Sequence, residues 1–282
     1  MRRRNLTTAT ITGYANAAEY FLRFLKAKGV PRLQDATPEL VDEYRASLAD
    51  RGLSASARDA YARGVKKLFA HLEKTGEVFA SPMAGLVMPR PRPRILPVPT
   101  PEDMERLLGS FDPAAPEGVR DRAMVELMYS TGVRLGELRA LTIHSPDTAN
   151  GTLRVMGKGR RERVVPLGRH AVRWLERWLR EARPALARGV DEEALLLNAL
   201  GGPMSAATIH HILDAASERA GIRRANPHAI RRACATHMLA NGAHPVEIQH
   251  LLGHATLGSL GRYLLATVAD LKKTHKKSKP GR

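Results

Sequence analysis

The stretch "GTLRVMGKGRRERVVPLG", residues 151–168, decides the fold class of this sequence. Apolar and polar residues alternate on both sides of Gly157-Lys158-Gly159-Arg160, and a period of two is the pattern of a half-buried strand. The central glycines favour a turn, so the stretch predicts a β-hairpin with Lys158 at its tip. A solvated turn lysine is the simpler interpretation of Lys158, and the G-x-x-x-x-G-K-[ST] pattern of a nucleotide-binding P-loop is absent.

The sequence on both sides of this hairpin has helical spacing. Thr100 is placed to cap a new helix, and residues 169–184 and 205–221 continue the helical pattern. Trp174 and Trp178 are four residues apart and share one face of their helix, which favours a place in the hydrophobic core. The hairpin is therefore an exception in a mainly α chain.

A proline-rich segment, "MPRPRPRILPVPTPEDM" at residues 88–104, interrupts the helical pattern. Alternating prolines hold a chain extended and cannot continue a helix, so this segment predicts a semi-rigid linker between two domains. Arg90, Arg92 and Arg94 give the linker a positive side that suits contact with a phosphate backbone.

Residues before the linker are helical in pattern throughout. Thr37 is a suitable N-cap and Pro38 a suitable first residue for one of these helices. Lys66 and Lys67 lie outside the apolar stripe of a later helix. This position is equally consistent with contact between the lysines and DNA and with a solvated helix face. We therefore expect a helical domain over residues 1–88, a linker over 89–99, a second domain over 100–270 and a basic tail over 271–282.

Charge and cysteine content narrow the class of protein. The chain has 45 Lys and Arg against 28 Asp and Glu, a formal net charge of +17 and a pI near 10.6, which favour a polyanionic partner over a merely basic soluble protein. Because Cys234 is the single cysteine, an intramolecular disulfide is excluded. The sequence has no cluster of His and Cys with the spacing of metal ligands, so it does not predict a metal site. No apolar run is long enough to span a bilayer, so we expect a soluble cytoplasmic protein.

Arg134 is the first candidate for phosphate chemistry. In "YSTGVRLGELRAL", residues 129–141, Gly132 can end a helix in a left-handed conformation and leave Arg134 at a helix junction. Glu137, three residues further on, can accept from the nearby backbone or hold the arginine.

A second candidate lies in "NPHAIRRACATHMLANG", residues 226–242. Asn226 is a good N-cap, and His228 and Arg231 are three apart on one helix face. An imidazole and a guanidinium beside the positive end of a helix favour an anion such as phosphate.

Near the end of the chain, the stretch "LLGHATLGSLGRYLLA" at residues 251–266 places His254 after a helix-ending glycine and Tyr263 nine residues later. Together, Arg134 in "TGVRLGEL", Lys158 in "GKGRRERVVPL", "HAIR", "LLGH" and the trailing tyrosine resemble the tyrosine site-specific recombinase family, also called phage integrases. The resemblance covers essentially the whole chain and rests on order, residue type and approximate spacing. Two glycines precede Tyr263, where many relatives have paired threonines.

The resemblance implies a mainly α chain of two domains, a helical core-DNA-binding domain of SAM-like fold and an α+β integrase-type catalytic domain with a small β-hairpin or sheet. It also implies a catalytic set that cleaves DNA through a 3′-phosphotyrosyl intermediate without metal or ATP. The nucleophile would be Tyr263, the phosphate clamp Arg134 and Arg231, and the general acid Lys158. His228 and His254 would assist, in roles that the sequence does not separate.

Double-stranded DNA is the implied partner, and four protomers would assemble on two sites. Arg160 and Arg161 of the hairpin join the candidate DNA contacts. The chain resembles a Xer-type or simple mobile-element recombinase, without an arm-binding domain. A non-catalytic DNA-binding protein on the same scaffold and a related DNA-relaxing topoisomerase are the alternatives.

Overall fold

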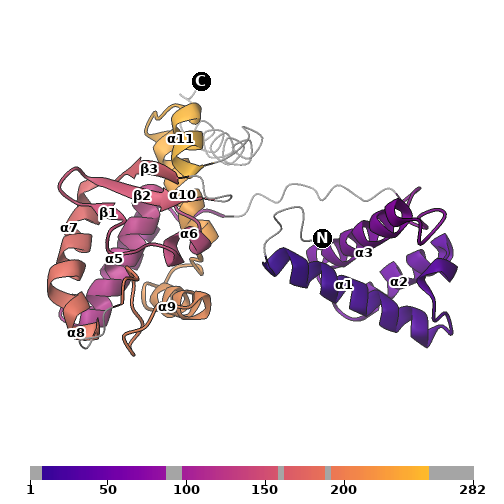
Figure 1. Cartoon of the computed structure of the whole chain (residues 1–282). Helices are drawn as coiled ribbons and strands as arrows, with labels where there is room; N and C mark the ends of the chain where they lie inside the picture. The colour runs from indigo at the N-terminus through magenta and orange to yellow at the C-terminus, as the bar shows by residue number, and fades with distance from the viewer. Residues whose placement is uncertain (1–7, 87–96, 158–161, 188–191, 254–282) are drawn as a thin grey trace, which may run out of the picture. The chain divides into compact units, whose positions relative to one another are not determined.

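The computed structural model describes residues 8–86, 97–157, 162–187 and 192–253 (Figure 1). The chain divides into two compact units, Met1–Arg92 and Pro93–Arg282. Among the described residues, no helix is both long and apolar enough to cross a membrane.

The first unit is helical. Its elements are α1 (Thr8–Ala27), a 3-10 turn (Leu33–Asp35), α2 (Pro38–Asp50) and α3 (Ala55–Thr75). The hydroxyl of Thr37 accepts from the backbone N–H of Leu40 and caps α2, as predicted. Local capping therefore sets where this helix begins.

Aromatic side chains from all three helices meet in the core of the first unit. Phe21 of α1 meets Tyr44 of α2 at 5.0 Å between ring centroids and Phe69 of α3 at 5.7 Å, both edge to face. Each of these rings is buried, and edge-to-face pairs add to the stabilisation from buried area. The buried sides of the three helices thus meet in one core.

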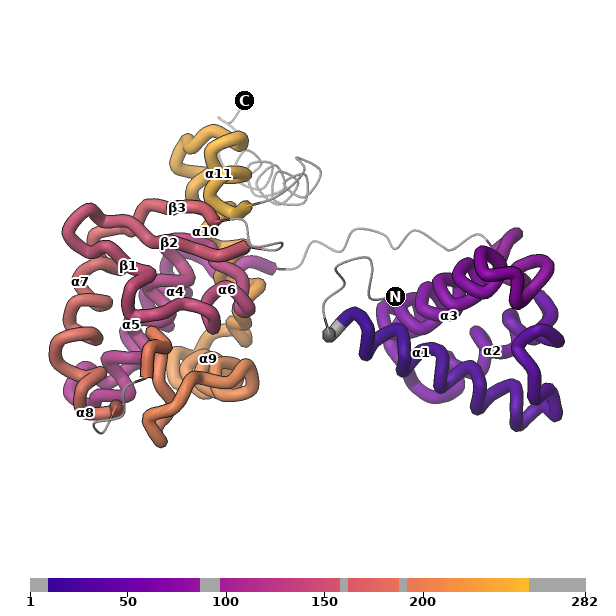
Figure 2. Tube along the Cα trace, in the orientation of Figure 1, coloured from indigo at the N-terminus to yellow at the C-terminus, as the bar shows by residue number. Residues whose placement is uncertain are grey.

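The second unit is built around α5 (Figure 2). Its helices are α4 (Pro101–Gly109), α5 (Pro116–Thr131), α6 (Leu135–Arg139), α7 (Arg169–Arg177), α8 (Arg183–Ala187), α9 (Ala206–Arg219), α10 (Pro227–Ala240) and α11 (Pro245–Leu252). Helix α5 contacts α4, α7, α8 and α10, and it has buried residues on all sides, as expected for a central helix.

A three-stranded antiparallel sheet completes the second unit. Its strands are β1 (Pro146–Asp147), β2 (Thr152–Met156) and β3 (Glu162–Pro166), in the order β1-β2-β3. Leu153 pairs with Val165, and Val155 with Arg163, so these four residues share the inward face. The predicted strands, and with them the mainly α class with a small sheet, are confirmed; residues 158–161 lie outside the described part.

Both tryptophans belong to the core, as their spacing predicted. Trp178 is fully buried and Trp174 is 9% exposed. The predicted helix over residues 169–184 contains a π turn at Trp178–Ala182, between α7 and α8. There the indole N–H of Trp178 donates to the carbonyl of Leu195 at 2.9 Å.

Candidate active site

Gly132 ends α5 and brings the next segment against α10 and α11. Its φ is +59°, in the left-handed region, and a Cβ added to it would lie 2.5 Å from Cδ2 of Leu252 and 3.3 Å from Sγ of Cys234. A side chain there would strain the backbone and force Leu252 to shift. The close approach places Arg134, two residues later, beside the end of α11.

Arg134 is held by Glu137, three residues further along. The backbone N–H of Arg134 donates to Oε2 of Glu137 at 2.9 Å, and its Nη1 donates to Oε1 at 2.7 Å. The Arg134 side chain is 39% exposed, whereas that of Glu137 is 7% exposed. The carboxylate thus orients the guanidinium and leaves part of it open to solvent.

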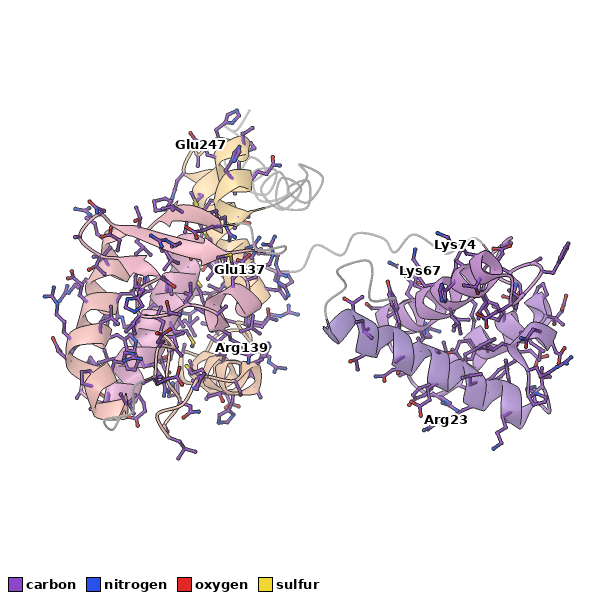
Figure 3. The ribbon with its side chains drawn as sticks, viewed as in Figure 1. Arg23, Lys67, Lys74, Glu137, Arg139 and Glu247 are labelled. Carbon is purple, nitrogen blue, oxygen red and sulfur yellow. The ribbon has the colours of Figure 1, made fainter. Side chains whose placement is uncertain are left out.

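Glu137, which lies on α6 (Figure 3), also pairs with an arginine that is distant in sequence. Arg163 of β3 donates from Nη1 to Oε1 at 3.1 Å and from Nη2 to Oε2 at 2.8 Å. Burial by itself raises the pKa of Glu137. The hydrogen bonds and charges of Arg163 and Arg134 outweigh burial and lower the pKa to about 2. Glu137 is therefore an anion between two guanidiniums.

Arg231 approaches the same region from α10. The side chain of Asn226 accepts from the backbone N–H of Ala229 at 2.9 Å, as predicted for an N-cap, and Pro227 is the first helical residue. Arg231, one turn into the helix, is 4% exposed. Its Nη1 donates to the carbonyl of Gly132 and its Nη2 to the carbonyl of Leu252 at 2.8 Å.

The C-terminal end of α11 brings the three arginines together. The carbonyls of Leu251, Leu252 and Gly253 accept, in that order, from Nε of Arg163 at 3.2 Å, from Nη2 of Arg231 at 2.8 Å and from Nη2 of Arg134 at 3.0 Å. The last carbonyls of a helix lack partners within it and lie at its negative end, which favours cations. We call Arg134, Arg163 and Arg231, with Glu137, the arginine cluster.

His228 lies one turn before Arg231 on α10. Partial burial lowers its pKa, and the positive charges of Arg231, Arg232, His210 and Arg134 lower it further. The imidazole is therefore mainly neutral at neutral pH, so that one ring nitrogen can accept a proton while the N–H of the other donates a hydrogen bond. The arginine cluster carries a net positive charge, and an anion such as a phosphate suits this surface.

Comparison with known proteins gives the family. The profile of the phage integrase family matches residues 98–269. The chain belongs to the phage integrase family. Members similar to it include the tyrosine recombinase XerC of Oceanobacillus iheyensis, 33% identical over 280 residues, which cover 98% of this chain and 92% of XerC. The tyrosine recombinase XerD of Pseudomonas putida is 34% identical over 281 residues, which cover 98% of this chain and 93% of XerD.

Solved integrase-family structures share the fold. The crystal structure of the XerH site-specific recombinase bound to a palindromic difH substrate superposes with a TM-score of 0.80 at 23% identity, and the match covers 96% of this chain and 80% of XerH. The predicted membership among tyrosine recombinases of the Xer type is confirmed.

Part of the predicted site lies outside the described residues. The arginine cluster brings Arg134 and Arg231 together. His228 lies with Arg231 near the N-terminal end of α10. The remaining predicted catalytic residues and several predicted DNA contacts are outside the described part: Lys158, His254, Tyr263, Arg90, Arg92, Arg94, Arg160 and Arg161. Within the described part, no group of three or more His, Cys, Asp and Glu side chains is placed to hold a metal ion.

The two lysines predicted to contact DNA lie on α3 in different environments. Lys66 is half-buried, and its Nζ donates to the carbonyl of Leu86 at 3.1 Å. Lys67 is exposed (Figure 3). Lys67 is thus free to reach a ligand, whereas Lys66 also joins α3 to the loop that follows it.

Arg163 is the residue that sequence reasoning missed. It lies two positions before Val165 in a strand whose alternate residues face inward, yet it is charged. A charge at an inward strand position needs a buried partner, and this requirement was the available signal. The partner, Glu137, is 26 residues away in sequence, so the strand pattern alone does not name it.

Proposed function

We propose that this chain, a tyrosine recombinase of the Xer type, cuts and rejoins double-stranded DNA through a covalent bond to Tyr263. The observation that carries the proposal is the convergence of Arg134 and Arg231, which donate to the adjacent carbonyls of Gly253 and Leu252. The residues that follow these carbonyls lead to Tyr263, ten positions after Gly253.

In the proposed reaction, the phenolic oxygen of Tyr263 attacks the scissile phosphorus. A P–O bond to the tyrosine forms, the bond to the 5′ oxygen breaks, and the phenol loses its proton. Lys158 gives a proton to the leaving 5′ oxygen, and His228 and His254 assist with proton transfer and phosphate binding. Attack by the 5′ hydroxyl of another strand reverses these steps, so neither ATP nor a metal is required.

Arg134 and Arg231 would stabilise the charge that develops on the non-bridging oxygens. Guanidinium forks match phosphate geometry, and preorganised donors act most strongly where water is excluded. Because Arg231 is 4% exposed, we expect that neighbouring groups move aside when DNA binds. The positive charge near His228, which lowers the pKa of its imidazole, would also favour ionisation of a nearby phenol.

A nicked duplex that traps the covalent intermediate tests the nucleophile. We expect an SDS-resistant protein–DNA adduct with the natural chain, and none with Tyr263→Phe, although DNA binding persists. The matched control is Tyr129→Phe, which removes a hydroxyl hydrogen-bonded to Nδ1 of His237 at 2.7 Å and should still form the adduct. Adduct formation by Tyr263→Phe refutes the assignment, and binding without any adduct supports a non-catalytic DNA-binding protein.

The phosphate clamp has its own test. Arg231→Lys should lower the single-turnover cleavage rate by about 100-fold, because a lysine cannot provide the planar fork. DNA affinity should change only a few-fold, since one phosphate contact among many contributes little. Equal losses in rate and affinity would contradict a transition-state role.

Strand exchange and relaxation are separated by a plasmid with two target sites. Exchanged products support a recombinase, whereas relaxed circles alone support a topoisomerase.

We further propose that four protomers act on two paired sites, which sedimentation of the protein on short duplexes would measure. DNA as substrate would place the protein at the nucleoid in the cytoplasm, where fluorescence imaging can locate it.

A further inference from the structure

Arg163 occupies an unusual position for an arginine. It stands on the inward face of β3, opposite Val155 and two residues before Val165, and its side chain is 17% exposed. A guanidinium in such a place destabilises a fold unless its donors are all paired. Selection for packing alone would favour an apolar side chain there.

All three nitrogens of this guanidinium donate to specific acceptors. Nη1 and Nη2 bind the two carboxylate oxygens of Glu137, at 3.1 and 2.8 Å, and Nε binds the carbonyl of Leu251 at 3.2 Å. A Cβ added at Gly253 would lie 3.1 Å from Cζ of Arg163, so the guanidinium also packs against that backbone. Arg163 thereby joins β3 to α6 and to the end of α11.

These contacts determine how Arg134 is held. Each oxygen of Glu137 accepts from both arginines: Oε1 from the two Nη1 atoms, and Oε2 from the backbone N–H of Arg134 and Nη2 of Arg163. The bidentate pair with Arg163 fixes the plane of the carboxylate. The carboxylate in turn fixes the guanidinium of Arg134, which also donates to the carbonyl of Gly253.

We propose that Arg163 is a positioning residue for the recombinase reaction. It acts through Glu137 and the carbonyl of Leu251, and it holds the Arg134 guanidinium and the end of α11 in the arrangement that receives the phosphate. Arg163 itself does not touch the phosphate. This inference rests on the proposed function, because it assigns the positioning to the same reaction.

The test measures the single-turnover rate at saturating protein and, separately, the affinity for the same nicked duplex. Arg163→Met should lower the rate by about 100-fold, as expected for a small misplacement of a catalytic group, and change the affinity by less than about threefold. The matched control is Arg154→Met on β2, whose Nε lies 3.3 Å from Glu162 and whose side chain is 66% exposed. The control should cleave at the natural rate.

A double-mutant cycle distinguishes positioning from a general loss of stability. If Arg163 acts through Glu137, Arg163→Met should slow the Glu137→Gln protein by less than about threefold, although it slows the natural chain far more. Losses that multiply in the double variant overturn the proposal. So does a rate for Arg163→Met equal to that of Arg154→Met.

Arg163→Lys keeps the test decisive if the methionine variant does not fold. A lysine retains the charge but cannot bind both oxygens of Glu137 and the Leu251 carbonyl together, so we expect about a tenfold lower rate in the folded protein. A natural rate in folded Arg163→Lys overturns the proposal. If the natural chain forms the Tyr263 adduct while the Arg163 variants cleave normally, this inference alone fails; absence of that adduct means that the proposed function fails.

Discussion

Replacing Glu137 with Gln removes the charge at the centre of the arginine cluster without changing the size of the side chain. Its carboxylate is 7% exposed and accepts from Arg134 and Arg163. The substitution leaves two guanidiniums next to a neutral amide, so the folded state loses both pairings. We expect the second unit to become markedly less stable at neutral pH.

The lowered pKa of Glu137 determines how much stability the substitution removes. The pKa falls from an ordinary value of 4.5 to about 2. At about 1.4 kcal/mol for each pH unit, ionised Glu137 stabilises the fold by about 3 kcal/mol at neutral pH, as an upper estimate. For a unit of this size, that corresponds to about 6 to 12 °C in Tm.

The direction of the pKa shift determines how the stabilisation by Glu137 changes with pH. Because the folded-state pKa lies below the unfolded-state value, the stabilisation is fully present above about pH 4.5 and is lost as the pH falls towards 2. The difference in unfolding free energy between the natural chain and Glu137→Gln should therefore shrink to about 2 kcal/mol at pH 3.5. Burial raises the pKa of Glu126 and that of Asp121, but both groups titrate in both proteins and cancel in the difference.

Urea unfolding followed by tryptophan fluorescence measures the effect. The chain has two tryptophans, Trp174 and Trp178, and both belong to the second unit. The control is Glu162→Gln, whose exposed pair with Arg154 should contribute no more than about 0.5 kcal/mol. A difference for Glu137→Gln below about 1 kcal/mol at pH 7, or one that stays constant down to pH 3.5, would refute the reasoning.

Three further predictions concern α5, α10 and α11. Gly132→Ala should cost about 2 kcal/mol in urea unfolding, because φ is +59° and the new Cβ would lie 2.5 Å from Leu252, and a loss under about 0.5 kcal/mol would contradict this account. Burial raises the pKa of the Cys234 thiol to about 12, so a thiol reagent should react with it only as the protein unfolds, and rapid labelling of the native chain would show an accessible thiol. The imidazole of His228 should titrate below its ordinary pKa of 6.5 by NMR; Arg231→Gln should raise that pKa, and an unchanged midpoint would show that the guanidinium does not act on it.

Local features of the sequence predicted much of the fold. Thr37 and Asn226 cap their helices through backbone N–H groups three residues later, and Gly132 and Gly253 end helices with positive φ. Such interactions depend on neighbours within one helical turn, so residue order alone makes them predictable. The alternation around Gly157 predicted the two long strands for the same reason.

The order of short motifs also pointed to the integrase family and to Arg134, His228 and Arg231. A long stretch of sequence separates Arg134 from Arg231, and local sequence patterns did not require their guanidiniums to lie close together. Contact between Arg134 and the carbonyl of Gly253 spans 119 residues, and that between Arg231 and Gly132 spans 99. Packing of α10 and α11 against the end of α5 brings these groups together.

What the sequence determined by itself was therefore the helical or strand character of the longer elements, the position of several helix ends, and the set of candidate phosphate-binding groups. What only the tertiary structure decided was which groups share acceptors. Glu137 lies between two arginines, and the consecutive carbonyls of Leu251, Leu252 and Gly253 at the end of α11 are each bound by a different arginine. The physical reason is that capping and periodicity act along the chain over a few residues. A buried charge is satisfied by whichever partner the packed helices and strands place beside it.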